Sequence, residues 1–94
     1  MRRVTWRPMA REDRANIMNY ISQDNPLAAA ELDDEIDAKT SALAKHPRLY
    51  KAGRVKGTRE MVIRPNYVVI YREASDEVTI LRVLHAAQQW PPAP

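Results

Sequence analysis

The chain has 94 residues, of which 45% are hydrophobic and 29% charged, so it is expected to form a single domain (1–94) and is too apolar to be wholly disordered. It has no cysteine and two histidines, which excludes disulfides, thiolate chemistry and cysteine-ligated zinc, and we expect no metal or cofactor. No apolar run approaches the roughly 20 residues that span a bilayer, so a cytoplasmic location is expected.

The net charge of +3 conceals an uneven distribution. Residues 23–38 carry six acidic side chains and no lysine or arginine, whereas residues 45–64 carry seven lysines and arginines and one glutamate. This contrast predicts a dipolar surface whose basic side suits phosphate or an acidic protein. A solvated basic loop is the simpler interpretation of the same pattern.

The N-terminal third predicts a strand followed by a helix. Residues 2–6 alternate in polarity over a short run, which favours a first strand that joins the sheet. Pro8 suits the first turn of a helix over 8–22, with Glu12 and Asp13 placed to complement the positive end of its dipole. The apolar positions of this helix are Met9 or Ala10, Ile17 and Ile21, widened by Met18 and Tyr20.

A second helix is predicted over 26–45. Asn25 is a good N-cap, Pro26 a natural first helical residue, and Pro47 stops the helix. His46 is most simply a helix-end residue that favours the C-terminal dipole. One face of this helix carries Ala29, Leu32, Ile36, Thr40 and Leu43.

Residues 47–57 form a predicted basic loop. Leu49 and Tyr50 are its expected anchors on the core. The only two glycines of the chain, Gly53 and Gly57, flank the middle of the loop and predict tight bends that present its basic side chains.

The C-terminal half predicts a three-stranded antiparallel meander. Runs rich in Val, Ile, Tyr and Thr occupy 58–63, 67–73 and 78–85, and short turn-type sequences separate them. The middle run has apolar residues on both faces of the predicted strand, so it should lie inside the sheet and not at an edge. The predicted fold class is therefore α+β, with an N-terminal strand, a two-helix hairpin and the meander. The proline-rich tail, 90–94, should lie over the surface, pinned by Trp90.

Three motifs in this order resemble the RelE/ParE superfamily of toxins from type II toxin–antitoxin modules. They are GRVKGTRE at 53–60, PNYVVIYR at 65–72 and ILRVLHAAQQWP at 80–91. The resemblance covers essentially the whole chain and is closest to the ParE-like branch.

This resemblance implies a small basic cytoplasmic toxin that arrests growth and whose antitoxin, encoded beside it, wraps and neutralises it. Such modules are associated with plasmid stabilisation. ParE-like members block DNA gyrase without being nucleases, whereas RelE-like members are ribosome-dependent mRNA endonucleases. The fold therefore does not choose between gyrase and the ribosome with its mRNA.

Metal-free RNA cleavage needs groups that move protons and cations that hold phosphate. His85 or Glu60 could transfer protons, and the catalytic candidates are Arg59, Arg72 and His85. Each has a structural alternative, since Arg59 could pair with Glu60 and Tyr71 could fill the core. His85 does not discriminate, because ParE-like sequences also carry a histidine there.

The favoured hypothesis is a non-enzymatic inhibitor of DNA gyrase, because the chain lacks the dense lysine loop and the basic, tyrosine-bearing tail of RelE-like nucleases. An inactive antitoxin-binding module is a further alternative. The expected target-binding or phosphate-binding residues are Arg54, Lys56, Arg59, Tyr71, Arg72 and Trp90. We expect oligomers with an acidic, partly disordered antitoxin that folds on the hairpin and the basic loop and contacts Arg54, Lys56 and Arg64.

Overall fold

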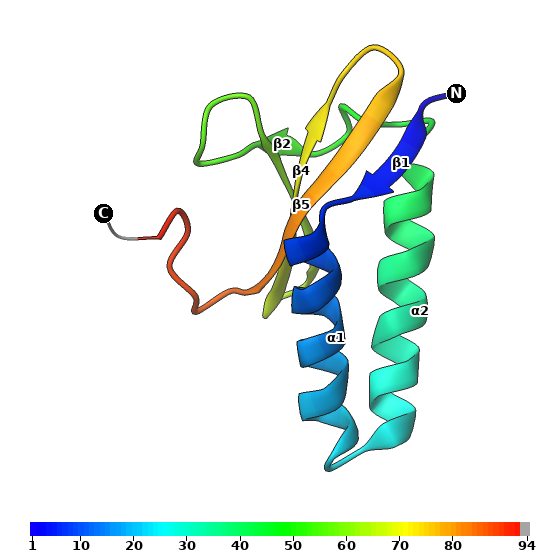
Figure 1. Cartoon of the computed structure of the whole chain (residues 1–94), viewed down its shortest axis with the longest axis vertical. Coiled ribbons are helices and arrows are strands. Elements are labelled where there is room, and N and C mark those ends of the chain that lie inside the picture. The colour runs from blue at the N-terminus through cyan, green and yellow to red at the C-terminus, as the bar shows by residue number, and fades with distance from the viewer. Residues whose placement is uncertain (93–94) are drawn as a thin grey trace.

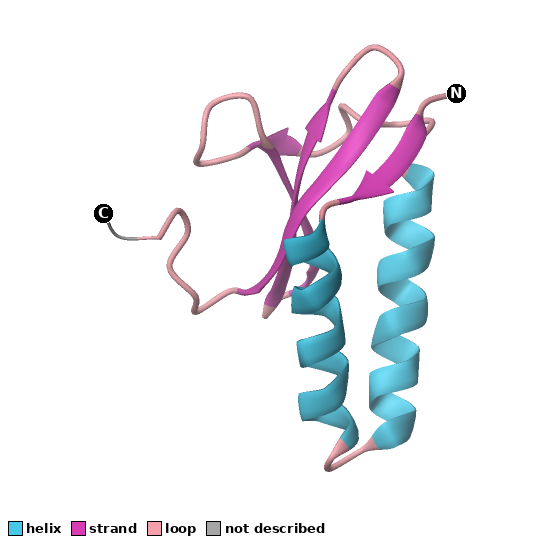
Figure 2. Cartoon of the chain, viewed as in Figure 1, coloured by secondary structure: helices cyan, strands magenta, loops and turns pink. Residues whose placement is uncertain are grey.

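A computed structural model describes residues 1–92 of the chain. Two helices pack against one face of a twisted sheet, and the α+β prediction is confirmed (Figure 1, Figure 2). The elements in chain order are β1 (Arg3–Trp6), α1 (Pro8–Ser22), α2 (Pro26–Ala42), β2 (Lys51–Ala52), β3 (Arg59–Arg64), β4 (Tyr67–Glu73) and β5 (Glu77–His85).

The sheet has five strands in the order β1-β5-β4-β3-β2. The antiparallel pairs β3–β4 and β4–β5 form the predicted meander. β1 lies parallel to β5, with Val4 opposite Val78, because the helical hairpin and three further strands intervene along the chain. This parallel pair makes the sheet mixed. β2 was not predicted; it is a two-residue stretch of the basic loop that pairs antiparallel with β3.

β4 lies at the centre of the sheet and is buried on both faces, as predicted. Tyr67, Val69 and Tyr71 face the helices and belong to the main core. Val68 and Ile70 face the opposite side and belong to a second, smaller cluster. We call that side the open face.

The helices cover the main core largely as the periodicity predicts. All five positions named for the α2 face (Ala29, Leu32, Ile36, Thr40 and Leu43) are buried. On α1 the buried residue is Ala10, while the side chain of Met9 is 56% exposed. The expected contribution of Tyr20 to the apolar face is wrong, since it is 76% exposed near the hairpin tip, which extends beyond the sheet (Figure 1).

The helix ends agree with the sequence in part. Pro8 is the first residue of α1, and the Asn25 side chain accepts a hydrogen bond from the Ala28 amide at 3.0 Å. The first turn of α1 contains no acidic residue, so the expected dipole contact of Glu12 and Asp13 is wrong. α2 ends at Ala42, three residues before the predicted 45, and residues 43–45 form a turn.

The loop after α2 is anchored by one of its two expected residues. Tyr50 packs against the main core, but Leu49 is 70% exposed. Within residues 1–92, neither helix combines the length and the apolarity needed to cross a bilayer. Of the predicted surface tail 90–94, the last two residues lie outside the described part of the chain.

Candidate functional site

The basic loop is tied to β3 through Glu60, whose side chain is 4% exposed. Glu60 accepts the Arg54 backbone amide at 2.8 Å and its Nε at 3.2 Å. Burial raises the pKa of Glu60, but the amide and guanidinium of Arg54 together with Lys51 outweigh it and leave the pKa below its ordinary value. Arg54 is thus held by Glu60, in place of the local pair expected between Arg59 and Glu60.

The two glycines shape the loop as predicted. The amide of Gly53 donates to the Thr58 carbonyl at 2.8 Å, and a β-carbon at Gly53 would collide with the Thr58 hydroxyl. Gly57 has φ of +84°, which an L side chain rarely adopts. Lys56 lies at the exposed turn between them and forms no ion pair or side-chain hydrogen bond with the described residues.

Two further candidates are engaged inside the fold. Arg59 Nη1 donates to the Tyr50 carbonyl at 2.7 Å. Tyr71 is fully buried, its hydroxyl donates to the Pro47 carbonyl at 2.6 Å, and burial raises its pKa to about 12. This placement argues against the expected contact of Tyr71 with a target, because the ring has no exposed surface.

His85 ends β5, is exposed and helps to reverse the chain. Its Nδ1 accepts the Ala87 amide at 3.1 Å, and its own amide donates to Gln88 Oε1 at 2.7 Å. The ring packs edge-on against Tyr67, with centroids 5.4 Å apart. The Nδ1 atom of His85 is thus engaged in the reversal of the chain that follows β5.

The tail covers the open face through Trp90. Its ring and Leu81 pack on the buried side chains of Val68, Ile70 and Leu84. The indole Nε1 is buried without an acceptor among the described residues. Trp90 therefore covers the open face of the sheet. Its ring becomes available to a partner only when the tail moves away from that face.

Two arginines on or beside the open face differ in their engagement. Arg72 on β4 is exposed, and in the described structure it has no ion-pair partner. Arg82 on β5 donates to both carboxylate oxygens of Asp13, at 2.7 and 3.0 Å, and this bond raises its pKa. Arg72 is the accessible one of the two.

Asp13 also accepts the backbone amide of Val83 at 3.0 Å. β1 ends at Trp6, opposite Ile80, so the edge of β5 would otherwise be unpaired from there onward. The carboxylate from α1 therefore replaces the missing strand, which is the physical reason why Asp13 does not serve its own helix terminus.

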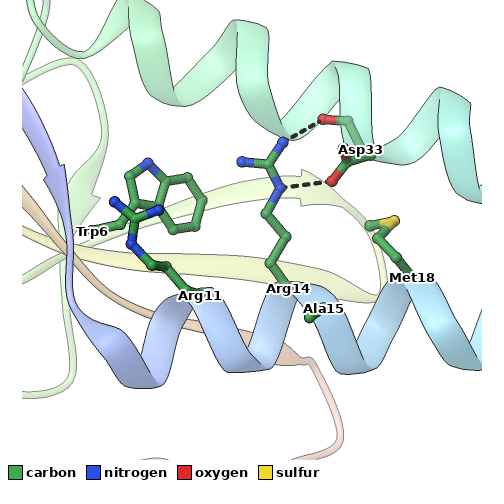
Figure 3. Close-up of a pocket in the computed structure, with 6 residues that line it drawn as sticks. All are labelled: Trp6, Arg11, Arg14, Ala15, Met18 and Asp33. Carbon is green, nitrogen blue, oxygen red and sulfur yellow. Dashed lines mark hydrogen bonds and ion pairs between the residues drawn. The ribbon is translucent and has the colours of Figure 1, made fainter.

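The outer side of the helical hairpin carries a hollow of about 380 Å³ (Figure 3). Arg14 crosses it, with its Nε 2.6 Å from Asp33 and its guanidinium 5.0 Å from the centre of the Trp6 ring. Arg11 also lines it and forms no ion pair within residues 1–92. The residues that line the hollow are Trp6, Arg11, Arg14, Ala15, Met18 and Asp33.

The acidic segment finds basic partners elsewhere in the chain. Arg64 Nε lies 2.8 Å from Glu35, and Lys39 Nζ lies 3.3 Å from the same carboxylate. The Arg64 bond is the largest influence on the pKa of Glu35 and lowers it. Arg64, an expected antitoxin contact, is thus already paired within the fold.

The structure does not assemble the sequence candidates into one site. Lys56 and Arg72 are exposed and unpaired in the described chain, whereas Arg54, Arg59, Arg64 and Tyr71 are engaged internally. Among residues 1–92, no three His, Asp or Glu side chains gather so that they could hold a metal ion.

A family model described as the ParE toxin of the type II toxin–antitoxin system parDE matches residues 4–90. The chain belongs to the ParE toxin family. Protein Y4kP of Sinorhizobium fredii is 41% identical over 91 residues, covering 96% of this chain and 94% of Y4kP. Toxin RelE2 of Caulobacter vibrioides is 37% identical over 86 residues, covering 89% of this chain and 92% of RelE2.

Solved structures share the fold of this ParE-family chain. A chain from the chromosomal ParDE system of P. aeruginosa superposes with a TM-score of 0.79 at 20% identity, over 90% of this chain and 96% of that one. A chain of the E. coli DinJ–YafQ toxin–antitoxin complex gives 0.66 at 13% identity, over 95% and 97%. These identities are low enough that the likeness speaks for the fold alone.

The hollow of the hairpin was not predicted, although the spacing of residues in α1 indicates it. Arg11, Arg14 and Met18 follow one another at spacings of three and four residues, which places them along one side of a helix. Trp6 lies just before this row. An aromatic residue followed by a row of arginines predicts a basic groove with an apolar floor.

Proposed function

We propose that this ParE-family toxin arrests growth by binding DNA gyrase, and that it does not cleave nucleic acid. The observation that carries the second part is the geometry of His85, whose Nδ1 already accepts the Ala87 amide. This contact supports a structural role for His85 in reversing the chain after β5. Arg59 and Tyr71, which a nuclease would need at phosphate, are bound to backbone carbonyls.

The proposed gyrase contact is the open face with the basic loop beside it. Lys56 and Arg72 offer unpaired positive charge there, and Trp90 offers an aromatic ring on the tail. Charged groups at the rim of an interface mainly set the rate of association, and buried aromatic anchors set its lifetime. Lys56 and Arg72 would therefore steer encounter, and Trp90 would hold the complex.

The test compares purified wild type with Lys56→Glu and Arg7→Glu in a gyrase supercoiling assay. Arg7 is exposed and lies on neither the open face nor the basic loop. Both variants replace a cation by a glutamate, so they change the net charge equally. We expect inhibition at micromolar wild type, about tenfold weaker inhibition by Lys56→Glu, and no change for Arg7→Glu. Failure of the wild type to inhibit supercoiling would overturn the proposal.

A second candidate is ribosome-dependent mRNA cleavage. It is favoured by the similarity to a toxin named RelE2 and by the exposed side chain of Arg72. Expression without an antitoxin, followed by primer extension on translated messages, separates the two functions. In-frame cuts would establish the nuclease, and loss of those cuts in His85→Ala would make His85 catalytic. Absence of growth arrest would instead indicate an inactive antitoxin-binding module.

We further propose that a cognate antitoxin lies along the hollow between α1 and α2. Trp6 and Met18 supply apolar floor, and Arg11 supplies unpaired positive charge for an acidic segment. A second hollow continues along the hairpin past Met18 and Asp33 to Ala29 and Ala30. A helix that folds on binding fits such a groove.

The antitoxin contact is tested by charge reversal at two places. We expect Arg11→Glu to weaken the complex at least tenfold and to reduce its salt dependence, because an unpaired cation is replaced. Lys56→Glu tests the predicted contact at the basic loop. It is a cleaner probe than Arg54→Glu, which would place two carboxylates together at Glu60. Unchanged affinity in either variant would remove that residue from the interface.

A further inference from the structure

A second basic hollow lies where α2 ends, apart from the open face and from the hollow of the hairpin. Its volume is about 340 Å³. We call it the α2-end hollow. The residues that line it are Arg2, Lys45, His46, Pro47, Arg48 and Leu49. It brings together the N-terminus and the loop after α2, which are more than forty residues apart in the chain.

Two guanidinium groups of this hollow are oriented by Glu73. Arg48 Nε donates to Glu73 Oε1 at 2.7 Å, and this bond is the largest influence that lowers the pKa of Glu73. Arg2 Nε donates to the Ala74 carbonyl at 2.8 Å, and its Nη2 lies 3.5 Å from Glu73 Oε2. Groups that are held in place before binding lose less entropy when a ligand arrives.

The charge of the hollow is not balanced. Arg2, Lys45 and Arg48 bring three cations to the hollow, and the one carboxylate that pairs with any of them in the described chain is Glu73, which pairs with Arg2 and Arg48. Glu73 Oε2 accepts no hydrogen bond among the described residues, so charge alone holds the Nη2 group of Arg2 near it. This group can turn to a second carboxylate, which is the acceptor that guanidinium groups match best.

The apolar rim decides which anion fits. Leu49 lines the hollow and is 70% exposed, although the sequence predicts it as a core anchor. A phosphate backbone gains nothing from a leucine, and single-stranded nucleic acid is usually held by stacking on several aromatic rings, whereas the lining has no Phe, Tyr or Trp and His46 is its one aromatic ring. A peptide that carries acidic residues around an apolar one uses both features.

We propose that the α2-end hollow binds an acidic peptide segment of a partner protein. One carboxylate of the segment lies on Arg2 and Arg48, and a neighbouring apolar side chain covers Leu49. Lys45 contributes charge at the rim, and His46 lies beside it in the lining. Glu73 is a positioning residue that fixes the two arginines. The proposal stands apart from the choice between gyrase and ribosome, because it involves neither the open face nor Lys56. Of the basic loop it uses only the first three residues, 47–49.

The experiment titrates the ¹⁵N-labelled chain with the peptide acetyl-Glu-Asp-Leu-Glu-Asp-amide and follows backbone amide shifts. We expect saturable shifts at residue 2 and at residues 45, 46, 48 and 49, and none with the isosteric peptide acetyl-Gln-Asn-Leu-Gln-Asn-amide. Lys45→Glu should weaken binding at least tenfold, and Leu49→Ser several-fold. Arg7→Glu changes the net charge as Lys45→Glu does and should leave the affinity unchanged.

Three outcomes would overturn the proposal. Equal weakening by Arg7→Glu would show that net charge alone attracts the peptide. Binding of the neutral peptide, or shifts confined to other residues, would show that the hollow does not recognise carboxylates. A short single-stranded oligonucleotide that binds the same residues more tightly than the acidic peptide would assign the hollow to nucleic acid. Lys45→Glu in the supercoiling assay reports on the gyrase proposal separately.

Discussion

The two faces of the sheet are buried by different means. On one face, two helices cover a core of twelve buried residues that includes Tyr71 and Ile80. On the open face, three buried residues lie under Leu81 and Trp90 at the end of the chain. β4 contributes to both, so a single strand joins a strongly covered face to a weakly covered one. The stability of the fold therefore depends mainly on the helical face, and substitutions on the open face should be tolerated better.

Magnitudes support this division. Full burial of a Val, Leu or Ile side chain contributes about 1.5–3 kcal/mol, so three residues contribute a few kcal/mol, while the helical face contributes several times more. The unpaired indole Nε1 of Trp90 offsets part of the gain on the open face, since a buried donor without an acceptor costs about 1–3 kcal/mol. The tail is therefore the part of the fold that is displaced most readily.

The largest effect is expected on the helical face. Leu32 of α2 is 1% exposed, and Leu32→Ala should lower the free energy of unfolding by about 3 kcal/mol because it leaves a cavity in the main core. Urea denaturation followed by circular dichroism measures the change. Leu27→Ala on the same helix, at an exposed position, is the matched control and should change stability by less than about 0.5 kcal/mol.

Next in size is the contact that joins α1 to β5. Asp13→Ala removes the partner of Arg82 and the acceptor of the Val83 amide, so we expect a loss of about 2 kcal/mol. Asp76→Ala, which removes only an exposed contact with Arg3, should cost less than about 0.5 kcal/mol. Similar losses in the two variants would mean that the β5 edge does not depend on Asp13.

What the sequence predicted well is local. Residue type and the turn sequences between the runs located β3, β4 and β5. Helical spacing found the whole buried face of α2, because that pattern repeats within a few residues. Pro8, Asn25 and the two glycines marked helix starts and loop bends through their own backbone preferences. These features depend on no distant partner, so the chain states them directly.

What the sequence did not predict is long-range pairing of charges. Arg14 meets Asp33 across 19 residues, Arg64 meets Glu35 across 29, and Arg82 meets Asp13 across 69. No periodicity encodes such pairs. The sequence therefore gave no sign that residues 23–38 have basic partners, or that Arg64 is paired within the fold and not free to contact an antitoxin. The sequence also left two roles open for Tyr71, a core position and a target contact. Because β4 is apolar on both faces, its pattern does not say which face the helices cover.

A smaller effect is expected when the open face loses its cover. Trp90→Ala should lower the free energy of unfolding by about 1–2 kcal/mol, less than Leu32→Ala, because Trp90 is only half-buried and its N–H is unpaired. Exposure of Val68, Ile70 and Leu84 should raise the fluorescence of bound anilinonaphthalene sulfonate while circular dichroism stays unchanged. A loss as large as that of Leu32→Ala would show that the two faces form one cooperative core.

The smallest effect concerns the charge buried beside the open face. The pKa of Glu60 is lowered in the fold, so its contribution to stability is complete above the ordinary range of glutamate and is lost as the pH falls through the folded pKa. Glu60→Gln keeps an acceptor for the Arg54 amide, and we expect it to cost about 1 kcal/mol at pH 7. The difference between wild type and variant should shrink as denaturation is repeated towards pH 3. A difference that stays constant with pH would mean that the Glu60 carboxylate is not charged in the fold. The bends at Gly53 and Gly57, without an ion pair to Arg54, would then hold the basic loop that carries Lys56.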